Sequence, residues 1–218
     1  MFKINLLSAN KNYKLIFKQI QKYNPNFFVI TDRGIYTKIK KKFKNKKVKI
    51  LNNFESLRSI KKSDITISAI PGIAGLKPTI ILTQLSKKIL IANKESVICG
   101  WDLIKKKAKK YKTRIVPLDS EHFSIFKILQ NQKNEEIKKV YLTASGGPFL
   151  NYKLKDFKNI QPKDAIKHPK WNMGKKISVD SSTLMNKMLE LIEAQKLFDI
   201  LESKLDILVH PESLVHAI

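Results

Sequence analysis

The chain has 218 residues, of which 43% are hydrophobic and 28% are charged, a balance that is ordinary for a globular protein with a buried core. It contains no run of about 18 apolar residues, so we expect no membrane-spanning segment. Lys3, Asn5 and Asn10 interrupt any apolar segment of a secretory signal. The single cysteine, Cys99, excludes a disulfide framework and predicts a cytoplasmic protein.

The formal net charge of +25 comes from 43 basic residues, of which only three are arginine. Planar recognition of phosphates and bases favours arginine over lysine. The lysines are spread along the chain, with one denser run from Lys38 to Lys47. We therefore interpret them as a solvated surface and expect no nucleic-acid partner. A basic nucleic-acid-binding module is the alternative, and it predicts tight, strongly salt-dependent binding.

Short β-rich runs alternate with helical stretches through the first half of the chain. This alternation predicts right-handed βαβ units and a parallel sheet, with ligands bound beyond the carboxyl ends of the strands. The expected strands are Lys3–Ser8, Phe27–Thr31, Val48–Leu51, Asp64–Ala69, Lys88–Ala92 and Arg114–Leu118. The expected helices include Tyr13–Lys22, Gly75–Ser86 and Lys94–Tyr111. A dinucleotide-binding Gly-x-Gly-x-x-Gly turn is absent from the sequence, so either the fold is not a dinucleotide binder or its first βα unit is missing.

The pattern changes after Leu118, which predicts one domain at 1–118 and a second at 119–218. The chain stops at Ile218 in mid-pattern, so we expect the second domain to be truncated. The elements expected after the boundary are a strand at Lys139–Thr143, a Ser145-Gly146-Gly147 turn, a helix at Ser182–Phe198, and strands at Ile207–Val209 and Ser213–Ile218.

Two carboxylates follow the strand that ends near Leu118. Period-two alternation places Asp119 and Glu121 on one face of an extended segment. Two close carboxylates repel each other unless a proton or a cation lies between them, and such oxygen ligands suit Mg²⁺ or Mn²⁺. The alternative is a pair of solvent-facing acids at a strand end.

A second polar segment opens the helix expected near Ser182. The run 181–183 forms an N-cap cluster, where free backbone N–H groups attract anions. Asn186, Lys187 and Glu190 follow on one side of the helix, which indicates a phosphate site with Glu190 one turn deeper. The alternative is an amphipathic helix with an ordinary surface pair.

Two loops complete the polar set. Ser145-Gly146-Gly147 can present backbone amides and a hydroxyl to a phosphate, or form a plain turn. The polar loop at 168–174 holds Trp171, a histidine and a glycine, and such loops often close over ligands. A tryptophan packed into a structural loop is the alternative.

Six motifs occur in one order along the chain, and the ordered set is far more specific than any single motif. They are Asn93-Lys94-Glu95-Ser96, Asp119-Ser120-Glu121-His122, Ala144-Ser145-Gly146-Gly147-Pro148-Phe149, His168-Pro169-x-Trp171-x-Met173-Gly174-x-Lys176-Ile177-Ser178-Val179-Asp180-Ser181, Met185-Asn186-Lys187 and His210-Pro211-x-Ser213. This series resembles the 1-deoxy-D-xylulose 5-phosphate reductoisomerases, a family of non-mevalonate isoprenoid biosynthesis. The resemblance runs from about Phe2 to Ile218.

The resemblance implies an α/β fold, in which a Rossmann-like parallel-sheet domain without its first βα unit precedes a truncated α+β catalytic domain. It also implies a homodimer in the complete enzyme. The implied reaction converts 1-deoxy-D-xylulose 5-phosphate to 2-C-methyl-D-erythritol 4-phosphate. A divalent cation (Mn²⁺, Mg²⁺ or Co²⁺) would assist the rearrangement, and NADPH would supply the hydride for the reduction.

The resemblance also assigns roles to residues. It implies metal ligands at Asp119, Glu121 and Glu190, and a catalytic set of Lys94, Glu121 and His168. It implies substrate contacts from Lys94, Ser120, Glu121, Ser145, His168, Ser181, Asn186, Lys187 and Glu190. It implies NADPH contacts from Asn10, Lys11, Asn12, Asn93, Glu95 and Gly174, and a covering flap with Trp171 and Met173.

The chain departs from the family pattern at both ends and at two internal positions. The family's first strand and glycine-rich turn would precede Phe2, and more of the catalytic domain would follow Ile218. Met188 stands where a small residue is expected, and Asn10 replaces a frequent glycine. Two enzyme-class alternatives remain: an inactive truncated fragment, and another NAD(P)-dependent dehydrogenase, which would show no dependence on divalent cations.

Overall fold

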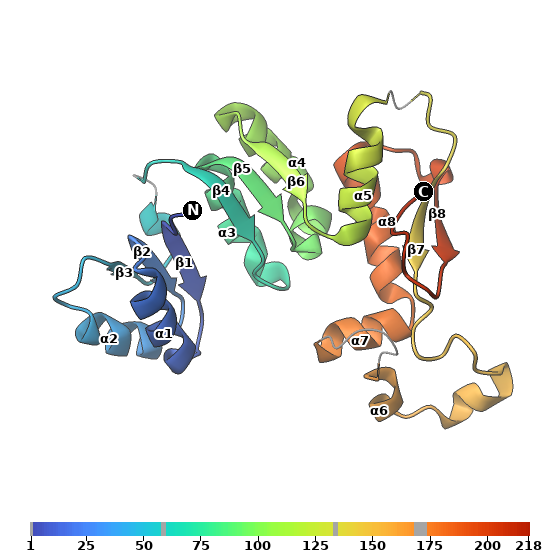
Figure 1. The fold of residues 1–218 in the computed structure, drawn as a ribbon, viewed down its shortest axis with the longest axis horizontal. Helices are drawn as coiled ribbons and strands as arrows, with labels where there is room; N and C mark the ends of the chain where they lie inside the picture. Colours follow the sequence, from blue (N-terminus) through green and yellow to red (C-terminus); the bar gives the residue numbers. More distant parts are fainter. Residues whose placement is uncertain (1, 58–59, 133–134, 168–173) are drawn as a thin grey trace.

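The structure is a computed structural model, and it describes residues 2–57, 60–132, 135–167 and 174–218. The chain forms three groups of parallel strands that follow one another in sequence, with helices packed against them (Figure 1). Short 3-10 turns lie in the connections within and between these groups: η1 (Glu55–Leu57), η2 (Ile73–Gly75), η3 (Leu129–Asn131), η4 (Leu154–Asn159) and η5 (Glu202–Lys204).

The first group is a parallel sheet of three strands in the order β1-β2-β3. Asn12 caps the first helix by accepting a hydrogen bond from the amide of Leu15, and Asp32 caps the second through the amide of Ile35. Buried apolar residues of both helices and the sheet, including Phe28, form one core. The elements are β1 (Leu6–Ala9), α1 (Tyr13–Tyr23), β2 (Phe27–Ile30), α2 (Arg33–Lys42) and β3 (Lys49–Leu51).

The second group is a parallel sheet in the order β4-β5-β6. Its core includes Ile89 and Ile104 and also takes in Val29 of β2, so the two sheets share apolar packing. Asn93 caps the long helix α4, because its Oδ1 accepts a hydrogen bond from the amide of Ser96. The elements are β4 (Ser63–Ser68), α3 (Leu76–Gln84), β5 (Ser86–Ile91), α4 (Lys94–Tyr111) and β6 (Arg114–Pro117).

The edges of these two sheets that lie nearest each other are β1 and β4 (Figure 1). Within the described part of the chain, no backbone ladder joins them. A side-chain hydrogen bond from Asn5 Nδ2 to Ser63 Oγ (3.5 Å) connects the regions where the two strands begin. The two sheets are separate ladders, each of three parallel strands with helices between them, as in the halves of doubly wound dinucleotide-binding folds. In such folds ligands bind beyond the carboxyl ends of the strands.

The third group pairs β7 with β8 in parallel and packs them against α5 and α8. Its core includes Ile125, Leu142 and Ala194. α8 also packs against α4, which connects this part of the chain to the second sheet. The elements are α5 (Ser120–Ile128), β7 (Val140–Ala144), α6 (Pro162–Ala165), α7 (Lys175–Ser182), α8 (Met185–Phe198) and β8 (Leu205–Val209).

The structure confirms the predicted α/β fold with parallel strands, but it corrects four local expectations. Ser213–Ile218 is not a strand, since it contributes only an isolated antiparallel bridge between Ala217 and Leu142. The helix expected at Ser182–Phe198 begins only at Met185: Ser182 is the last residue of α7, and Leu184, in a left-handed conformation (φ 58°), separates the two helices. The run 181–183 therefore ends α7 and is not an N-cap. Asp119 and Glu121 lie at the start of α5 and not on a strand.

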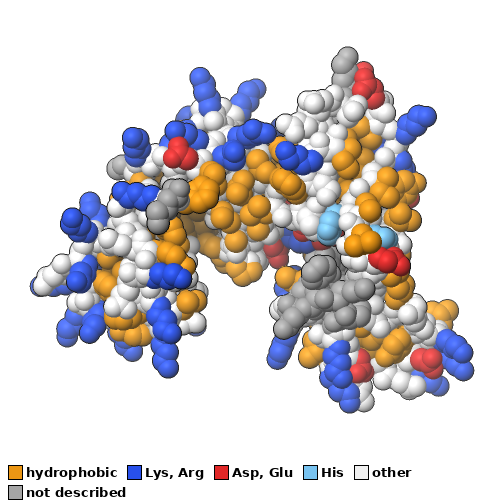
Figure 2. Space-filling model, viewed as in Figure 1, with side chains coloured by type: hydrophobic (Ala, Val, Ile, Leu, Met, Phe, Trp, Pro, Cys, Tyr) orange, Lys and Arg blue, Asp and Glu red, His pale blue; other side chains and the backbone are white. Residues whose placement is uncertain are grey.

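Lysine and arginine side chains are spread over the visible face, and many project from its outline (Figure 2). This distribution agrees with a solvated lysine surface. In the described ranges no helix is long and apolar enough to cross a membrane.

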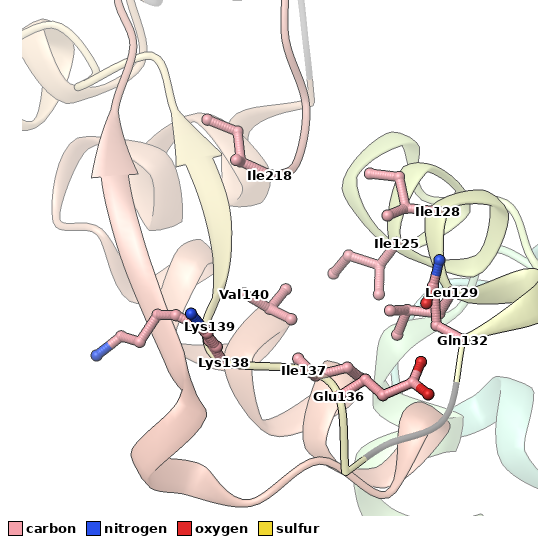
Figure 3. Close-up of a pocket in the computed structure, with 10 residues that line it drawn as sticks. All are labelled: Ile125, Ile128, Leu129, Gln132, Glu136, Ile137, Lys138, Lys139, Val140 and Ile218. Carbon is pink, nitrogen blue, oxygen red and sulfur yellow. The ribbon is translucent and has the colours of Figure 1, made fainter.

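A pocket of about 210 Å³ lies between α5 and the start of β7 (Figure 3). Its walls are mainly apolar, and its charged side chains, Glu136, Lys138 and Lys139, come from the segment that leads into β7. It has no converging set of polar groups of the kind that orients a ligand. The lining residues are Ile125, Ile128, Leu129, Gln132, Glu136, Ile137, Lys138, Lys139, Val140 and Ile218.

Gly75, at the start of α3, has no room for a side chain. A Cβ there would collide with the carbonyl oxygen of Ile70 and lie 3.0 Å from Asn93 Nδ2. We expect Gly75→Ala to lower the free energy of unfolding by about 1–3 kcal/mol, measured by urea denaturation. Gly34→Ala is the matched control, because its new methyl would meet an ordinary 3.4 Å contact; equal stability losses in both variants would contradict the steric explanation.

Candidate functional site

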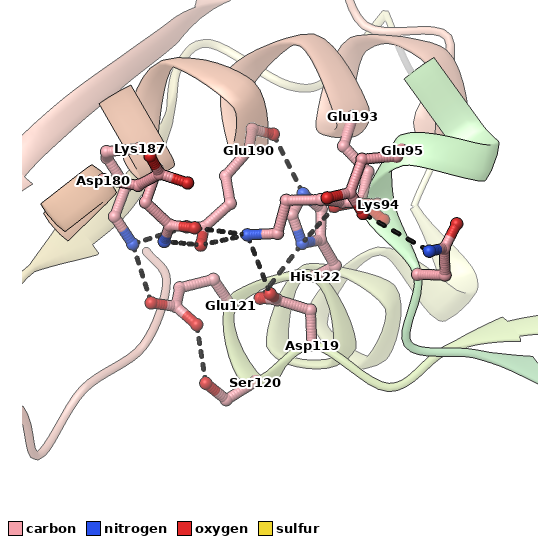
Figure 4. Close-up of polar contacts among 12 residues, drawn as sticks. Lys94, Glu95, Asp119, Ser120, Glu121, His122, Asp180, Lys187, Glu190 and Glu193 are labelled. Atoms are coloured by element: carbon pink, nitrogen blue, oxygen red, sulfur yellow. Dashed lines mark hydrogen bonds and ion pairs between the residues drawn. The ribbon is translucent and has the colours of Figure 1, made fainter. Parts of the chain in front are cut away.

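Three predicted carboxylates meet where the first turns of α4 and α5 approach α8 (Figure 4). Asp119 and Glu121 come from the start of α5, and Glu190 comes from the second turn of α8. One oxygen from each of the three lies within 4.8 Å of the others. Glu190 is only 2% exposed, so its charge is largely removed from water.

Two lysines balance these carboxylates. Lys94 Nζ donates hydrogen bonds to Glu190 Oε1 and Asn186 Oδ1, both at 2.8 Å, and lies 3.6 Å from Asp119 Oδ2. Lys187 Nζ lies 2.7 Å from Glu121 Oε1 and 2.6 Å from Glu190 Oε2. Asn186 Nδ2 also donates to Glu190 Oε1. Each lysine therefore touches two of the three carboxylates.

The charges of these groups depend on one another. Burial would lower the pKa of Lys94, but Glu190 and Asp119 outweigh it and hold the pKa above its usual value. Burial likewise opposes a charged Lys187, whose pKa is raised by Glu190 and Glu121. Burial would raise the pKa of Asp119, yet His122 and Lys94 hold it well below its usual range. Lys94, Lys187 and Asp119 therefore stay charged at neutral pH.

The residues present fit a divalent cation. Three carboxylates converge on one point, and oxygen ligands are those that Mg²⁺ and Mn²⁺ prefer. In this structure the ammonium groups of Lys94 and Lys187 neutralise the carboxylates. A cation would supply the same neutralisation and would free the lysines to contact other anions.

A second polar group lies directly behind the carboxylates. His122 is fully buried; its Nδ1 lies 3.1 Å from Asp119 Oδ1 and 3.6 Å from Glu193 Oε2. Burial alone would lower the pKa of His122, but Asp119 and Glu193 outweigh this effect and raise the pKa to about 9. Burial raises the pKa of Glu193 to about 7, against the opposing effect of His122. The sequence interpretation missed both residues, although the spacing of Glu193 from Glu190, three positions along a helix, pointed to a shared face.

The residues predicted to hold a phosphate come from two places that the fold brings together. Gly146 and Gly147 have positive φ (88° and 68°), so their loop follows a path that suits glycine. A Cβ on Gly147 would lie 2.9 Å from the carbonyl oxygen of Ser181, so the loop after β7 rests directly against the end of α7. Asn186 and Lys187 follow in the first turn of α8.

The predicted cofactor residues divide into two groups. Asn93 is buried and its Nδ2 donates to the carbonyl oxygens of Ile70 and Gly72, so its side chain holds the loop after β4. Glu95 lies 3.7 Å from Lys176 of α7, which brings it close to the helix that Gly174 caps. The run 10–12 is exposed and lies at the carboxyl end of β1, where Asn12 caps α1.

Ser120 lies beside Glu121, to which its hydroxyl donates at 2.6 Å. His168, Trp171 and Met173 lie outside the described residues, so the proposed flap and its histidine stay predictions.

The fold and the site together define an α/β protein with two parallel three-stranded sheets, as in dinucleotide-binding folds, and a carboxylate–lysine centre. Family models agree with this class. The model described as 1-deoxy-D-xylulose 5-phosphate reductoisomerase matches residues 1–100, and the model of that enzyme's C-terminal domain matches residues 115–198. The chain belongs to the 1-deoxy-D-xylulose 5-phosphate reductoisomerase family.

Known relatives are similar over the whole chain. The 1-deoxy-D-xylulose 5-phosphate reductoisomerase of Pelagibacter ubique is 53% identical over 100% of this chain and 57% of its own length. That of Wolbachia from Drosophila simulans is 46% identical, over 100% of this chain and 56% of its own. The chain therefore spans a little over half the length of these relatives.

Solved structures show the same likeness. A crystal structure of DOX-P reductoisomerase with NADPH, fosmidomycin and magnesium aligns with a TM-score of 0.87 and 37% identity, covering 99% of this chain and 56% of the other. The enzyme from Zymomonas mobilis, in complex with NADPH, also aligns with a TM-score of 0.87, at 35% identity and the same coverage.

The raised pKa of His122 predicts a pH dependence of stability without divalent cations. The folded value of about 9 exceeds the unfolded value of 6.5, so the stabilisation is complete below pH 6.5 and is lost as pH rises through 9. We expect the free energy of unfolding in EDTA to fall by about 3 kcal/mol more between pH 6 and 10 in the natural chain than in His122→Gln. Parallel pH profiles for the two proteins would contradict a charged, ion-paired His122.

Proposed function

We propose that this chain carries the catalytic centre of an NADPH-dependent reductoisomerase that converts 1-deoxy-D-xylulose 5-phosphate to 2-C-methyl-D-erythritol 4-phosphate in non-mevalonate isoprenoid synthesis. The observation that carries the proposal is the convergence of Asp119, Glu121 and Glu190 within 4.8 Å. Family membership supports the reaction type.

The three carboxylates would hold a divalent cation such as Mg²⁺, Mn²⁺ or Co²⁺. A cation there supplies Lewis-acid polarisation of the substrate's carbonyl oxygen during the rearrangement. The side chains around the cation would bind the substrate and move protons. Lys94, which reaches the same carboxylates, can place its ammonium beside a substrate oxygen and hold or move a proton at its Nζ.

The substrate's phosphate would bind on the α8 side of the centre. Lys187 carries a positive charge in the first turn of this 14-residue helix, where backbone N–H groups and the helix dipole also favour anions. Ser145, Ser181 and Asn186 add polar groups from neighbouring elements. We propose this set, together with Ser120, as the substrate-binding surface, with His168 and the flap residues Trp171 and Met173 closing over it.

NADPH would supply the hydride. The support for its position is the parallel arrangement of the strands, because ligands of such folds bind beyond the carboxyl ends of the strands. Asn10, Lys11 and Asn12 follow β1, whereas Asn93 follows β5 and Glu95 approaches the helix capped by Gly174. Because the side chain of Asn93 is hydrogen-bonded to the loop after β4, we propose that it shapes the cofactor site by holding this loop in place.

Three broader proposals accompany this function. The cofactor domain comprises residues 1–118 and the catalytic domain residues 119–218. The complete protein acts as a homodimer on a small phosphorylated sugar. The single cysteine, exposed Cys99, supports a cytoplasmic location.

The test is Glu190→Gln in the full-length protein. We expect the Mg²⁺-dependent and substrate-dependent loss of NADPH absorbance to slow on the order of 1000-fold, because a neutral amide cannot replace a carboxylate ligand. Glu202→Gln, at an exposed position in η5, is the matched control and should leave the rate unchanged. A near-normal rate for Glu190→Gln would remove the cation from this site. If the unsubstituted protein instead reduced another carbonyl compound without a divalent cation, it would be a different NAD(P)-dependent dehydrogenase.

A further inference from the structure

Glu193 is a buried acid that the proposed reaction does not use. It is 2% exposed and lies on α8 three residues after Glu190, facing the same side of the helix. Its Oε2, together with His122 Nδ1 and Asp119 Oδ1, is buried and makes no well-aligned hydrogen bond to the described residues. A buried acid that lacks such a hydrogen bond is costly, so its presence calls for a physical reason.

The surroundings of His122 supply that reason. Its Nε2 lies 2.9 Å from the backbone carbonyl oxygen of Glu190, which can only accept, so Nε2 carries a hydrogen. Its Nδ1 faces the carboxylate oxygens of Asp119 and Glu193, at 3.1 and 3.6 Å. Asp119 Oδ1, the nearer of the two, is an acceptor, and a lone pair on Nδ1 would be repelled by it. The ring is therefore a donor on both sides, with Asp119 as the acceptor at Nδ1 and Glu193 as the second acid beside it.

His122 joins the two elements that carry the carboxylate centre. It belongs to α5, as do Asp119 and Glu121, and it contacts the backbone of Glu190 and the side chain of Glu193 on α8. Its ring also lies nearly parallel to that of Phe198, at 15° and a centroid distance of 6.4 Å, so packing fixes its plane. Any rotation of the imidazole would move the partner of Asp119.

The two oxygens of Asp119 point to different partners. Oδ1 faces His122, whereas Oδ2 faces Lys94 and the carboxylate centre. The contact of Oδ1 with His122 therefore leaves Oδ2 on the side of the cation site. Glu193 is the second acid on His122, so it keeps the ring aimed between the two carboxylates.

We propose that Glu193 is a positioning residue, which holds His122 in the orientation that turns one oxygen of Asp119 toward the cation site. This inference rests on the cation site of the proposed function. Groups that orient a ligand from outside the ligand set commonly change metal affinity roughly 10- to 100-fold when they are removed.

The experiment measures Mn²⁺ binding to the natural chain and its variants at pH 8, from the electron paramagnetic resonance signal of free Mn²⁺. We expect Glu193→Gln to weaken binding roughly 10- to 100-fold, although the substituted amide does not touch the cation site. Glu193→Asp, which keeps the charge, should restore part of the affinity. Glu202→Gln, at an exposed position, should bind like the natural chain.

Unchanged Mn²⁺ affinity in Glu193→Gln, with binding lost in Glu190→Gln, would overturn the positioning role and leave the cation site standing. Unchanged affinity in Glu190→Gln would refute the cation site itself. Two Mn²⁺ ions on the natural chain and one on Glu193→Gln would show that Asp119, His122 and Glu193 bind a cation directly, which also overturns the proposal. Nitrogen-15 spectra of the natural chain give a test that needs no variant: both ring nitrogens of His122 should carry hydrogens, and a bare Nδ1 would refute the arrangement.

Discussion

The mutual repulsion of three carboxylates is the constraint on which the site depends. Asp119, Glu121 and Glu190 meet within 4.8 Å in a largely dry place, where like charges repel far more strongly than they do in water. Lys94 and Lys187 make the arrangement possible because each reaches two of the three acids. The same contacts keep the lysines charged. Removing any member would leave a buried charge without a partner, so the five groups behave as one unit.

This unit also explains how the chain is arranged. α8 packs against both α4 and α5, and each of these helices delivers its polar residues from its first turn. Helix starts expose backbone N–H groups and a partial positive charge, which favours acids nearby. The rigid helix bodies behind them carry the apolar core, including Ile125 and Ala194. The packing of the helices therefore sets the distances between the polar side chains.

Much of the fold was accessible from the sequence because its signals are local. Alternating apolar runs gave the parallel strands, and α4 was predicted with its observed bounds, Lys94–Tyr111. The break at Leu184 was not, because a leucine with positive φ carries no compositional signal and is imposed by the packing of α7 against α8. The predicted carboxylates do meet, but from helix starts, so the strand-alternation argument for Asp119 and Glu121 was wrong. His122 and Glu193 were given no role because the contact between them joins α5 to α8 and becomes visible only once these two helices are packed together.

In the part of the chain that the structure describes, β1 and β4 each have one edge without a backbone ladder, and this has a consequence for the behaviour of the chain in solution. Ile65 and Ile67 of β4 are 44% and 62% exposed, and Figure 2 shows hydrophobic side chains gathered over the second sheet. An open strand edge beside exposed isoleucines is a template for strands of other molecules. The net charge of +25 keeps copies apart through repulsion, which salt screens. Colloidal stability should therefore decrease as ionic strength rises. The many lysines, which we do not interpret as a nucleic-acid-binding surface, would then keep the protein from associating with itself.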